Sequence, residues 1–201
     1  VKGRAPQPPR KGTGRLPGRP RLELVHHDGE QTHLSLGVRV PGRHWEHRWA
    51  LAVLNTALGG GLSSRLFQEV RETRGLAYSV YSAVDTFADG GALSVYAACL
   101  PERFDEVARV TTEVLDTVVR DGITDSECRI AKGSIRGGMI LGLEDSASRM
   151  NRLGRSELNH GQYRSVADAL AHIDSVSVDE VNAVARRVLS GNFGGAVLGP
   201  H

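Results

Sequence analysis

The sequence predicts an α+β domain in which an antiparallel sheet is covered on one face by helices. Alternating apolar residues mark two strands near the beginning of the chain, and two further strands are expected between residues 77 and 100. A glycine triplet at 59–61 separates two stretches with helical spacing, and a long helical region precedes one short final strand. The resulting order, β-β-α-α-β-β-α-α-α-β, is typical of an α+β domain.

The first two strands are predicted from residues that alternate between two faces. Leu22, Leu24 and His26 share one face, and the segment 33–40 places Leu34, Leu36, Val38 and Val40 on one side. Between them, Asp28 and Gly29 have the sequence of a tight turn. We therefore expect these two strands to pair with each other as an antiparallel hairpin.

Helical spacing over residues 44–58 predicts the first helix, and its nearly continuous apolar run indicates that it is covered on several sides. A second helix is expected from Ser63 to Arg74, where Gly75 ends it. The strands that follow are expected at Ala77–Phe87 and Ala92–Leu100.

The second half of the chain contains clear helix starts. Pro101 is suited to the first position of a helix. Two pairs have the spacing of capping boxes, namely Thr124 with Glu127 and Ser177 with Glu180. A short apolar strand, Gly194–Leu198, closes the chain.

Composition divides the chain into two parts. At 201 residues with 40% hydrophobic content, it is long enough for one substantial domain, expected at 21–201. Residues 1–20 contain six basic side chains, no acid and little to bury, which predicts a flexible basic linker rich in proline and glycine. An alternative role for this segment is an arm for nucleic acid. The net charge of only +2 demands no polyanionic partner, and we expect none.

The two cysteines, Cys99 and Cys128, form no CxxC motif, which makes a disulfide framework improbable and favours a reducing compartment. The longest apolar stretch, 50–58, is far shorter than the roughly 20 residues that a membrane-spanning helix needs. We therefore expect a cytoplasmic protein without a membrane partner.

Motifs for several chemistries are absent. The glycine triplet is not followed by Lys-Ser or Lys-Thr, so it is no phosphate loop, and no Gly-x-Ser-x-Gly elbow occurs. His44 and His47 lie close enough to share a helix face, but their spacing does not fit the His-x-x-Glu-His pattern of zinc peptidases. The alternative for this pair is a polar first helical turn.

The segment NTALGGGLSSRLFQEVRETRGLAYSVYS, residues 55–82, resembles the carboxy-terminal domain of the pitrilysin-like (M16) zinc peptidases, which include the mitochondrial processing peptidase. Residues 30–37 are similar to the first strand of that domain, and the resemblance extends over 21–198. It implies one half of a two-domain clamshell that closes on a chamber. In this family the first half binds zinc through His-x-x-Glu-His, whose glutamate acts as general base toward the metal-bound water.

This chain contains no such motif, so the resemblance implies the half without zinc. The complete enzyme is then expected to be a zinc metallopeptidase whose cofactor is held by a zinc-bearing amino-terminal half or subunit, while this chain alone is inactive. Peptide substrates are the other expected partner, and a homodimer is compatible with the family. A non-catalytic scaffold or assembly protein that keeps the fold is the alternative function.

By resemblance, Arg71 and Tyr78 are the residues that contact substrate and stabilise the oxyanion. Their chemistry suits this role, because arginine is a forked, permanently charged donor and tyrosine offers a hydroxyl at the start of a strand. The alternative is that Arg71 pairs with Glu69 or Glu72 at the surface while Tyr78 packs in the sheet. The strand near 79–83 is a further candidate, since a free edge can accept an extended peptide.

Overall fold

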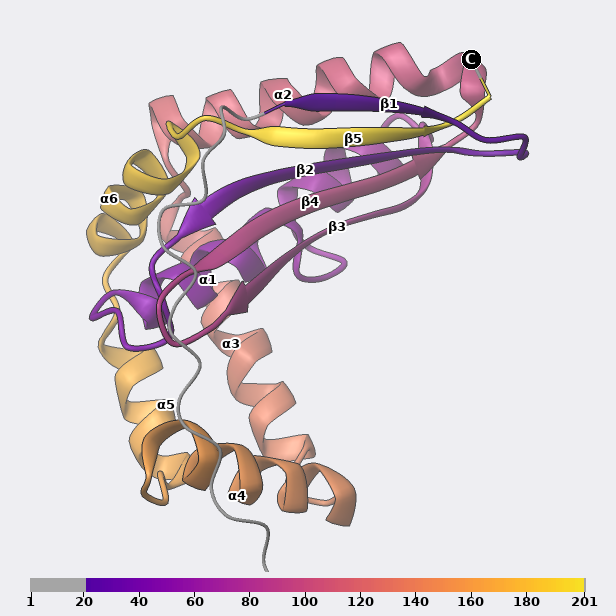
Figure 1. The fold of residues 1–201 in the computed structure, drawn as a ribbon. Helices are drawn as coiled ribbons and strands as arrows, with labels where there is room; N and C mark the ends of the chain where they lie inside the picture. The colour runs from indigo at the N-terminus through magenta and orange to yellow at the C-terminus, as the bar shows by residue number, and fades with distance from the viewer. Residues whose placement is uncertain (1–20, 201) are drawn as a thin grey trace, which may run out of the picture.

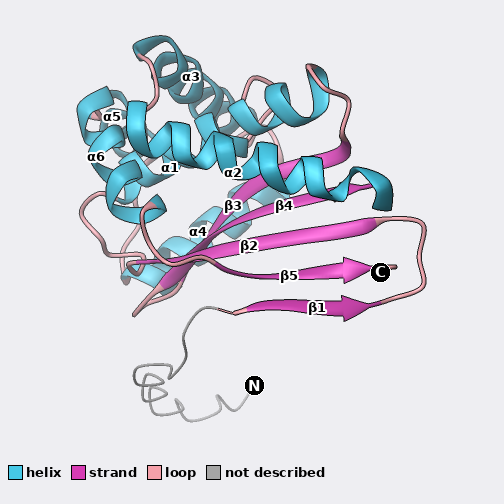
Figure 2. Cartoon of the chain, turned by 90° about the horizontal axis from the view of Figure 1, so that it is seen from above, coloured by secondary structure: helices cyan, strands magenta, loops and turns pink. Residues whose placement is uncertain are grey.

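The computed structural model describes residues 21–200, which form a five-stranded sheet with helices against one face (Figures 1 and 2). This arrangement confirms the predicted α+β class. The spatial order of the strands is β1-β5-β2-β4-β3. Their bounds are β1 Leu22–His26, β2 Thr32–Val40, β3 Ala77–Thr86, β4 Gly91–Cys99 and β5 Gly194–Gly199. The predicted linker at 1–20 lies outside the described residues.

The predicted hairpin between the first two strands is wrong. Strand β5 lies between β1 and β2, parallel to β1 and antiparallel to β2. Two glycines in β5 lack the side chains that would hinder this insertion. A Cβ at Gly195 would meet the Ser35 carbonyl oxygen at 2.6 Å, and a Cβ at Gly199 would meet Thr32 Oγ1 at 2.6 Å. The loop 27–31 bridges a gap two strands wide, roughly 10 Å.

The first helix, α1 (Arg48–Gly59), is buried along most of its length, as its apolar run predicts. It packs against β3, α3 and α6. At its carboxyl end Gly59 approaches β3 so closely that a Cβ would lie 2.4 Å from the backbone nitrogen of Ser82. Ser82 Oγ donates to Asn55 Oδ1 at 2.8 Å in the same contact. A glycine at this position therefore sets the distance between helix and sheet.

The predicted second helix is present in a different form. Its main part is a π-helix, η1 (Phe67–Glu72), in which the Thr73 amide donates to the Gln68 carbonyl five residues earlier. Gly75, at φ +60°, then reverses the chain, and the Leu76 amide donates to the Val70 carbonyl at 2.9 Å. Helical spacing in the sequence predicts a helix here. It does not distinguish a π-helix from an α-helix, because the two place apolar residues at similar positions over a segment of only six residues.

The remaining helices include two that the periodicity did not predict, α4 and α5. After a 3-10 turn at Pro101–Arg103, the helices are α2 Phe104–Asp121, α3 Asp125–Leu141, α4 Ser146–His160, α5 Val166–Ser175 and α6 Val178–Leu189. Thr124 and Glu127 form the predicted capping box at α3, and the Ser177 side chain accepts from the Glu180 amide at α6. The α3–α5 part extends beyond the end of the sheet (Figure 1).

Both cysteines, Cys99 and Cys128, are buried and free. Burial, with a smaller contribution from Glu102, raises the pKa of the Cys99 thiol. Among residues 21–200, no helix combines the length and the apolar character that crossing a membrane requires.

The contact at Gly59 gives a stability prediction. We expect Gly59→Ala to lower the free energy of unfolding by roughly 1–3 kcal/mol, because the new methyl group must displace the β3 backbone rather than a flexible side chain. Urea denaturation measures the change. Gly133→Ala in α3 is the matched control: its Cβ meets nothing within 4 Å, so helix propensity alone predicts a gain of up to about 1 kcal/mol. Equal effects of the two substitutions would contradict the tight contact.

Candidate functional site

Arg71 is held by the π-helix η1 at the point where the chain turns into the sheet. The Gly75 amide donates to the Arg71 carbonyl at 3.0 Å, which closes the turn directly behind the residue. Its side chain is half-buried. Because π-helical turns add one residue to a helix, they shift the direction of the side chains that follow. Arg71, which the family resemblance selects as a substrate contact, lies at such a turn.

Tyr78 occupies a β-bulge at the beginning of β3. In the pairing with β4, Ala77 lies opposite Cys99 and Ser79 lies opposite Ala98, so Tyr78 has no partner of its own. A bulge changes the direction of the side chain it carries. Tyr78 is accordingly 77% exposed, although its neighbour Ala77 is buried in the core. The structure thus presents the phenol ring at the surface.

The structure brings the two predicted residues together. The Arg71 guanidinium carbon lies 5.4 Å from the centre of the Tyr78 ring and 4.9 Å from the centre of the Phe67 ring. Both distances are in the range of cation–π contact, which restricts where the guanidinium can point. Phe67 lies four residues before Arg71, and the i, i+4 spacing places it beside the arginine.

The alternative arrangement of these residues is not present. Arg71 forms no ion pair with a described carboxylate. Glu69, one of the two partners considered, is bound by Arg74. Tyr78 does not pack in the sheet. Arg71 therefore keeps donors available for another acceptor.

An ion pair anchors the chain just before the π-helix. Arg65 binds both carboxylate oxygens of Glu127, and its Nη2 also donates to the Gly122 carbonyl at 2.8 Å. Glu127 accepts from the Thr124 amide as part of the capping box. Burial alone would raise the pKa of Glu127, but the hydrogen bonds from Arg65 and Thr124 outweigh it and lower the pKa to about 2. The pair fixes the site segment to the amino terminus of α3.

Beside Tyr78, the outer strand β3 carries a second aromatic residue that the sequence reasoning did not select. Tyr81 lies opposite Tyr96 of β4, with ring centres 5.1 Å apart, and the Tyr96 hydroxyl lies 2.7 Å from His33 Nδ1. No described strand pairs with the other side of β3. The register between β3 and β4 brings Tyr81 and Tyr96 together. Spacing along the sequence does not predict this register.

The two histidines considered for metal binding have other contacts. His47 Nδ1 lies 2.9 Å from Glu180 Oε1 of α6, while the His44 ring packs on His160 of α4 at 5.4 Å. Both lie before α1, which begins at Arg48 and not at residue 44 as the spacing predicts, and His47 is its N-cap. Within residues 21–200, no three His, Cys, Asp or Glu side chains gather in an arrangement suited to a metal ion.

Comparison with known proteins shows the family. The model of the peptidase M16 inactive domain matches residues 1–135. An uncharacterized zinc protease from Mycobacterium tuberculosis is 73% identical over the whole chain, which covers 46% of that protein. A second uncharacterized zinc protease, from Bacillus subtilis, is 37% identical over 171 residues, with 85% of this chain and 42% of that protein covered.

A solved structure agrees at the level of the fold. It is described as the peptidase M16 inactive domain from Pseudomonas fluorescens, with a TM-score of 0.82, 24% identity, and coverage of 92% of this chain and 45% of that one. The chain is thus an α+β half of a peptidase-like architecture. It belongs to the peptidase M16 family and corresponds to its inactive domain. It spans about half the length of the curated relatives it matches.

The Glu127 pair predicts a pH dependence. A carboxyl whose pKa falls from 4.5 to about 2 on folding stabilises the protein above pH 4.5, and this contribution is lost as the pH falls toward 2. We expect Glu127→Gln to lower the free energy of unfolding at pH 7 by on the order of 2 kcal/mol. The difference from the parent should shrink between pH 5 and pH 2.

Denaturant unfolding at several pH values measures this difference. Glu113→Gln is the control, because the exposed pair of Glu113 with Arg109 should contribute less than about 1 kcal/mol at any pH. A difference between Glu127→Gln and parent that stays constant down to pH 2 would contradict the ion pair.

Proposed function

We propose that this chain is the substrate-binding half, without zinc, of a zinc metalloendopeptidase that hydrolyses peptides in a closed chamber. The observation that carries the proposal is the contact between Arg71 and Tyr78 at the surface of the domain. Family membership and the names of the relatives support the peptidase class. The zinc-bearing partner lies on the other half of the longer protein or on a separate subunit, and we place the complete enzyme in the cytoplasm.

Zinc, when bound by the partner half, supplies the activated water for hydrolysis. The residues of this chain bind and orient the peptide. The Tyr78 hydroxyl donates a hydrogen bond to the scissile carbonyl oxygen, where negative charge develops in the transition state. Arg71 holds the phenol ring by its cation–π contact and donates its free N–H groups to the same peptide.

The free edge of β3 is suited to hold the extended peptide. Its outward amide and carbonyl groups have no described strand partner, so a substrate can add as a further strand by main-chain hydrogen bonds. The edge begins beside Tyr78. A substrate bound there therefore passes the two polar side chains in the extended form that hydrolysis requires.

Tyr78→Phe tests the role of the hydroxyl once this chain is paired with its zinc-bearing half. Removing one oxyanion donor should reduce kcat by on the order of 10²- to 10³-fold, with zinc content and folding unchanged. Arg71→Lys keeps the charge but loses the planar fork, so it should also reduce kcat. If both residues act on one peptide, the double variant should lose less than the sum of the two effects in free energy.

The matched control is Tyr81→Phe, which removes a hydroxyl from the same strand three residues away. It should leave kcat within about twofold, since Tyr81 stacks on Tyr96. If Tyr78→Phe also leaves kcat and KM unchanged, Tyr78 is no oxyanion donor. If the complete protein with an intact zinc motif cleaves no peptide, the scaffold alternative is supported instead.

Metal content gives an independent test. We expect the isolated chain to fold as one α+β domain and to retain less than one zinc per ten chains after dialysis, since no described group of side chains offers three ligands. Elemental analysis measures this content, with the complete two-half protein as positive control. One tightly held zinc per isolated chain would overturn the assignment to the half without zinc.

A further inference from the structure

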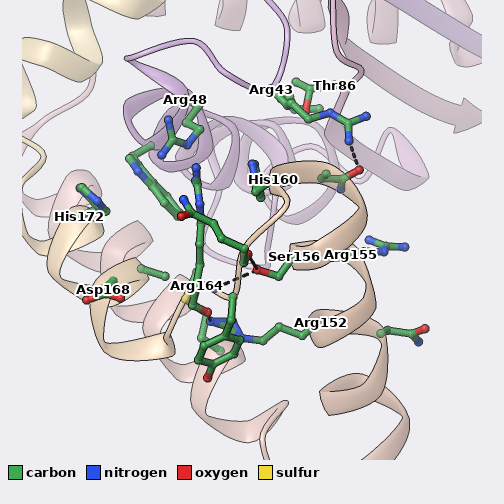
Figure 3. A pocket seen from close by; sticks show the side chains of 18 of the residues that line it. Arg43, Arg48, Thr86, Arg152, Arg155, Ser156, His160, Arg164, Asp168 and His172 are labelled. Atoms are coloured by element: carbon green, nitrogen blue, oxygen red, sulfur yellow. Dashed lines mark hydrogen bonds between the residues drawn. The ribbon is translucent and has the colours of Figure 1, made fainter. Parts of the chain in front are cut away.

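A large pocket with a strongly basic lining lies at the far end of β3 from Tyr78. Its volume is about 1140 Å³. The loop before α1, the end of β3, α4 and the segment that leads into α5 surround it (Figure 3). Five arginines line it, namely Arg43, Arg48, Arg152, Arg155 and Arg164. The acidic residues of the lining are Asp85 and Asp168. The pocket thus carries an excess of positive charge.

The arginines of this pocket lack carboxylate partners. None of the five forms an ion pair with a described Asp or Glu. Three of them form hydrogen bonds to uncharged acceptors, which are weaker than ion pairs. Arg43 donates to Asn159, Arg152 donates to the Arg164 carbonyl at 2.7 Å, and Arg48 reaches the Trp45 carbonyl at 3.4 Å. Elsewhere in the described chain, arginines such as Arg65 and Arg136 bind carboxylates directly. What distinguishes the pocket is that five arginines without a carboxylate partner line the same cavity.

Buried polar atoms without partners gather in the same pocket. Of the four such side-chain atoms in the described residues, three belong to its lining: Arg43 Nε, Trp49 Nε1 and His160 Nδ1. The first two are obligatory hydrogen-bond donors. A buried donor without an acceptor is costly, so oxygen atoms of water or of a bound ligand would stabilise this site.

The positive charges also act on one another. Burial, followed by the nearby charge of Arg164, lowers the pKa of Arg48. Burial lowers the pKa of His160 as well, with Arg164, His44, Arg48 and Arg43 adding to the effect. Groups from α1, α4 and the segment before α5 therefore share one electrostatic environment. An anion would relieve their repulsion, whereas a neutral ligand would not.

The position of the pocket indicates what kind of anion it binds. Val84, Asp85 and Thr86, the last residues of β3, line it, and the Arg43 amide donates to the Phe87 carbonyl just beyond. Tyr78 lies eight residues earlier on the same strand, roughly 26 Å away along its length. A peptide added to the β3 edge at Tyr78 would thus lead into the pocket.

We propose that this arginine-lined pocket binds the carboxylates of an acidic peptide segment that extends along the edge of β3. The inference rests on the proposed function and adds a substrate class to it: peptides with Asp or Glu side chains, or a terminal carboxylate, about eight residues from the bond at Tyr78. The forked guanidinium groups match carboxylates in bidentate geometry.

Calorimetric titration of the 201-residue chain tests the pocket without turnover. The probes are two peptides of roughly twelve residues, long enough to follow the strand, that differ only in an end block of glutamates or glutamines. We expect the glutamate peptide to bind at least about tenfold more tightly at low salt, and this preference to decrease as salt is added.

Substitutions locate the binding. Arg48→Gln and Arg164→Gln should each weaken the glutamate peptide about tenfold and leave the glutamine peptide unchanged. Arg129→Gln on α3 removes the same charge outside the pocket and should have no effect. Thermal unfolding checks that each variant is folded. Arg164→Lys, which keeps the charge, should retain part of the affinity and so separates a charge effect from a misfolded variant.

Two binding results would overturn the inference. One is equal binding of the glutamate and glutamine peptides. The other is binding of inorganic pyrophosphate, with the same dependence on Arg48 and Arg164, while the glutamate peptide does not bind. In the complete enzyme, cleavage that depends on Tyr78 but shows no preference for the glutamate peptide would reject this inference alone, and the proposed function would remain.

Discussion

The ion pair between Arg65 and Glu127 is the interaction on which the geometry of the candidate site depends. Glu127 has two structural roles, since it closes the capping box of α3 and holds the guanidinium that precedes the π-helix. Arg65 in turn reaches the Gly122 carbonyl at the end of α2. One contact thus joins α2, α3 and the segment that carries Arg71.

From this anchor the site follows by a short, constrained path. Leu66 and Val70 are buried and fix the inner side of the π-helix, while Gly75 turns the chain into β3. The bulge then places Tyr78 outside the regular ladder. Each step is a local backbone feature, so Arg71 and Tyr78, which are only seven positions apart in the sequence, meet. The site is therefore built almost entirely within one continuous segment.

The sequence selects Arg71 and Tyr78 through the family resemblance, and the local construction explains why the two side chains meet. A helix end, a glycine and a strand start follow one another directly between them. The pairing of β1 with β5 could not be predicted, because β5 comes from the far end of the chain. No turn motif in the sequence indicates that β5 lies between β1 and β2. Helix α4 was missed because most of its residues are polar; its larger apolar side chains, Met150, Leu153 and Leu158, stay exposed, and Ser156 is its one buried residue. The basic pocket combines Arg48 with Arg164, which are distant in sequence, so only the fold reveals it.

The unpaired edge of β3 has a consequence for the isolated half. A ten-residue strand that presents free amide and carbonyl groups, with two exposed tyrosines along it, is a template for any other extended chain, including a second copy of itself. Asp85 places the one negative charge of the strand near its end, where like-charge repulsion opposes such pairing in register. The edge that the proposed function assigns to the peptide is therefore also the surface of this domain most prone to aggregation, and a peptide bound there would shield it.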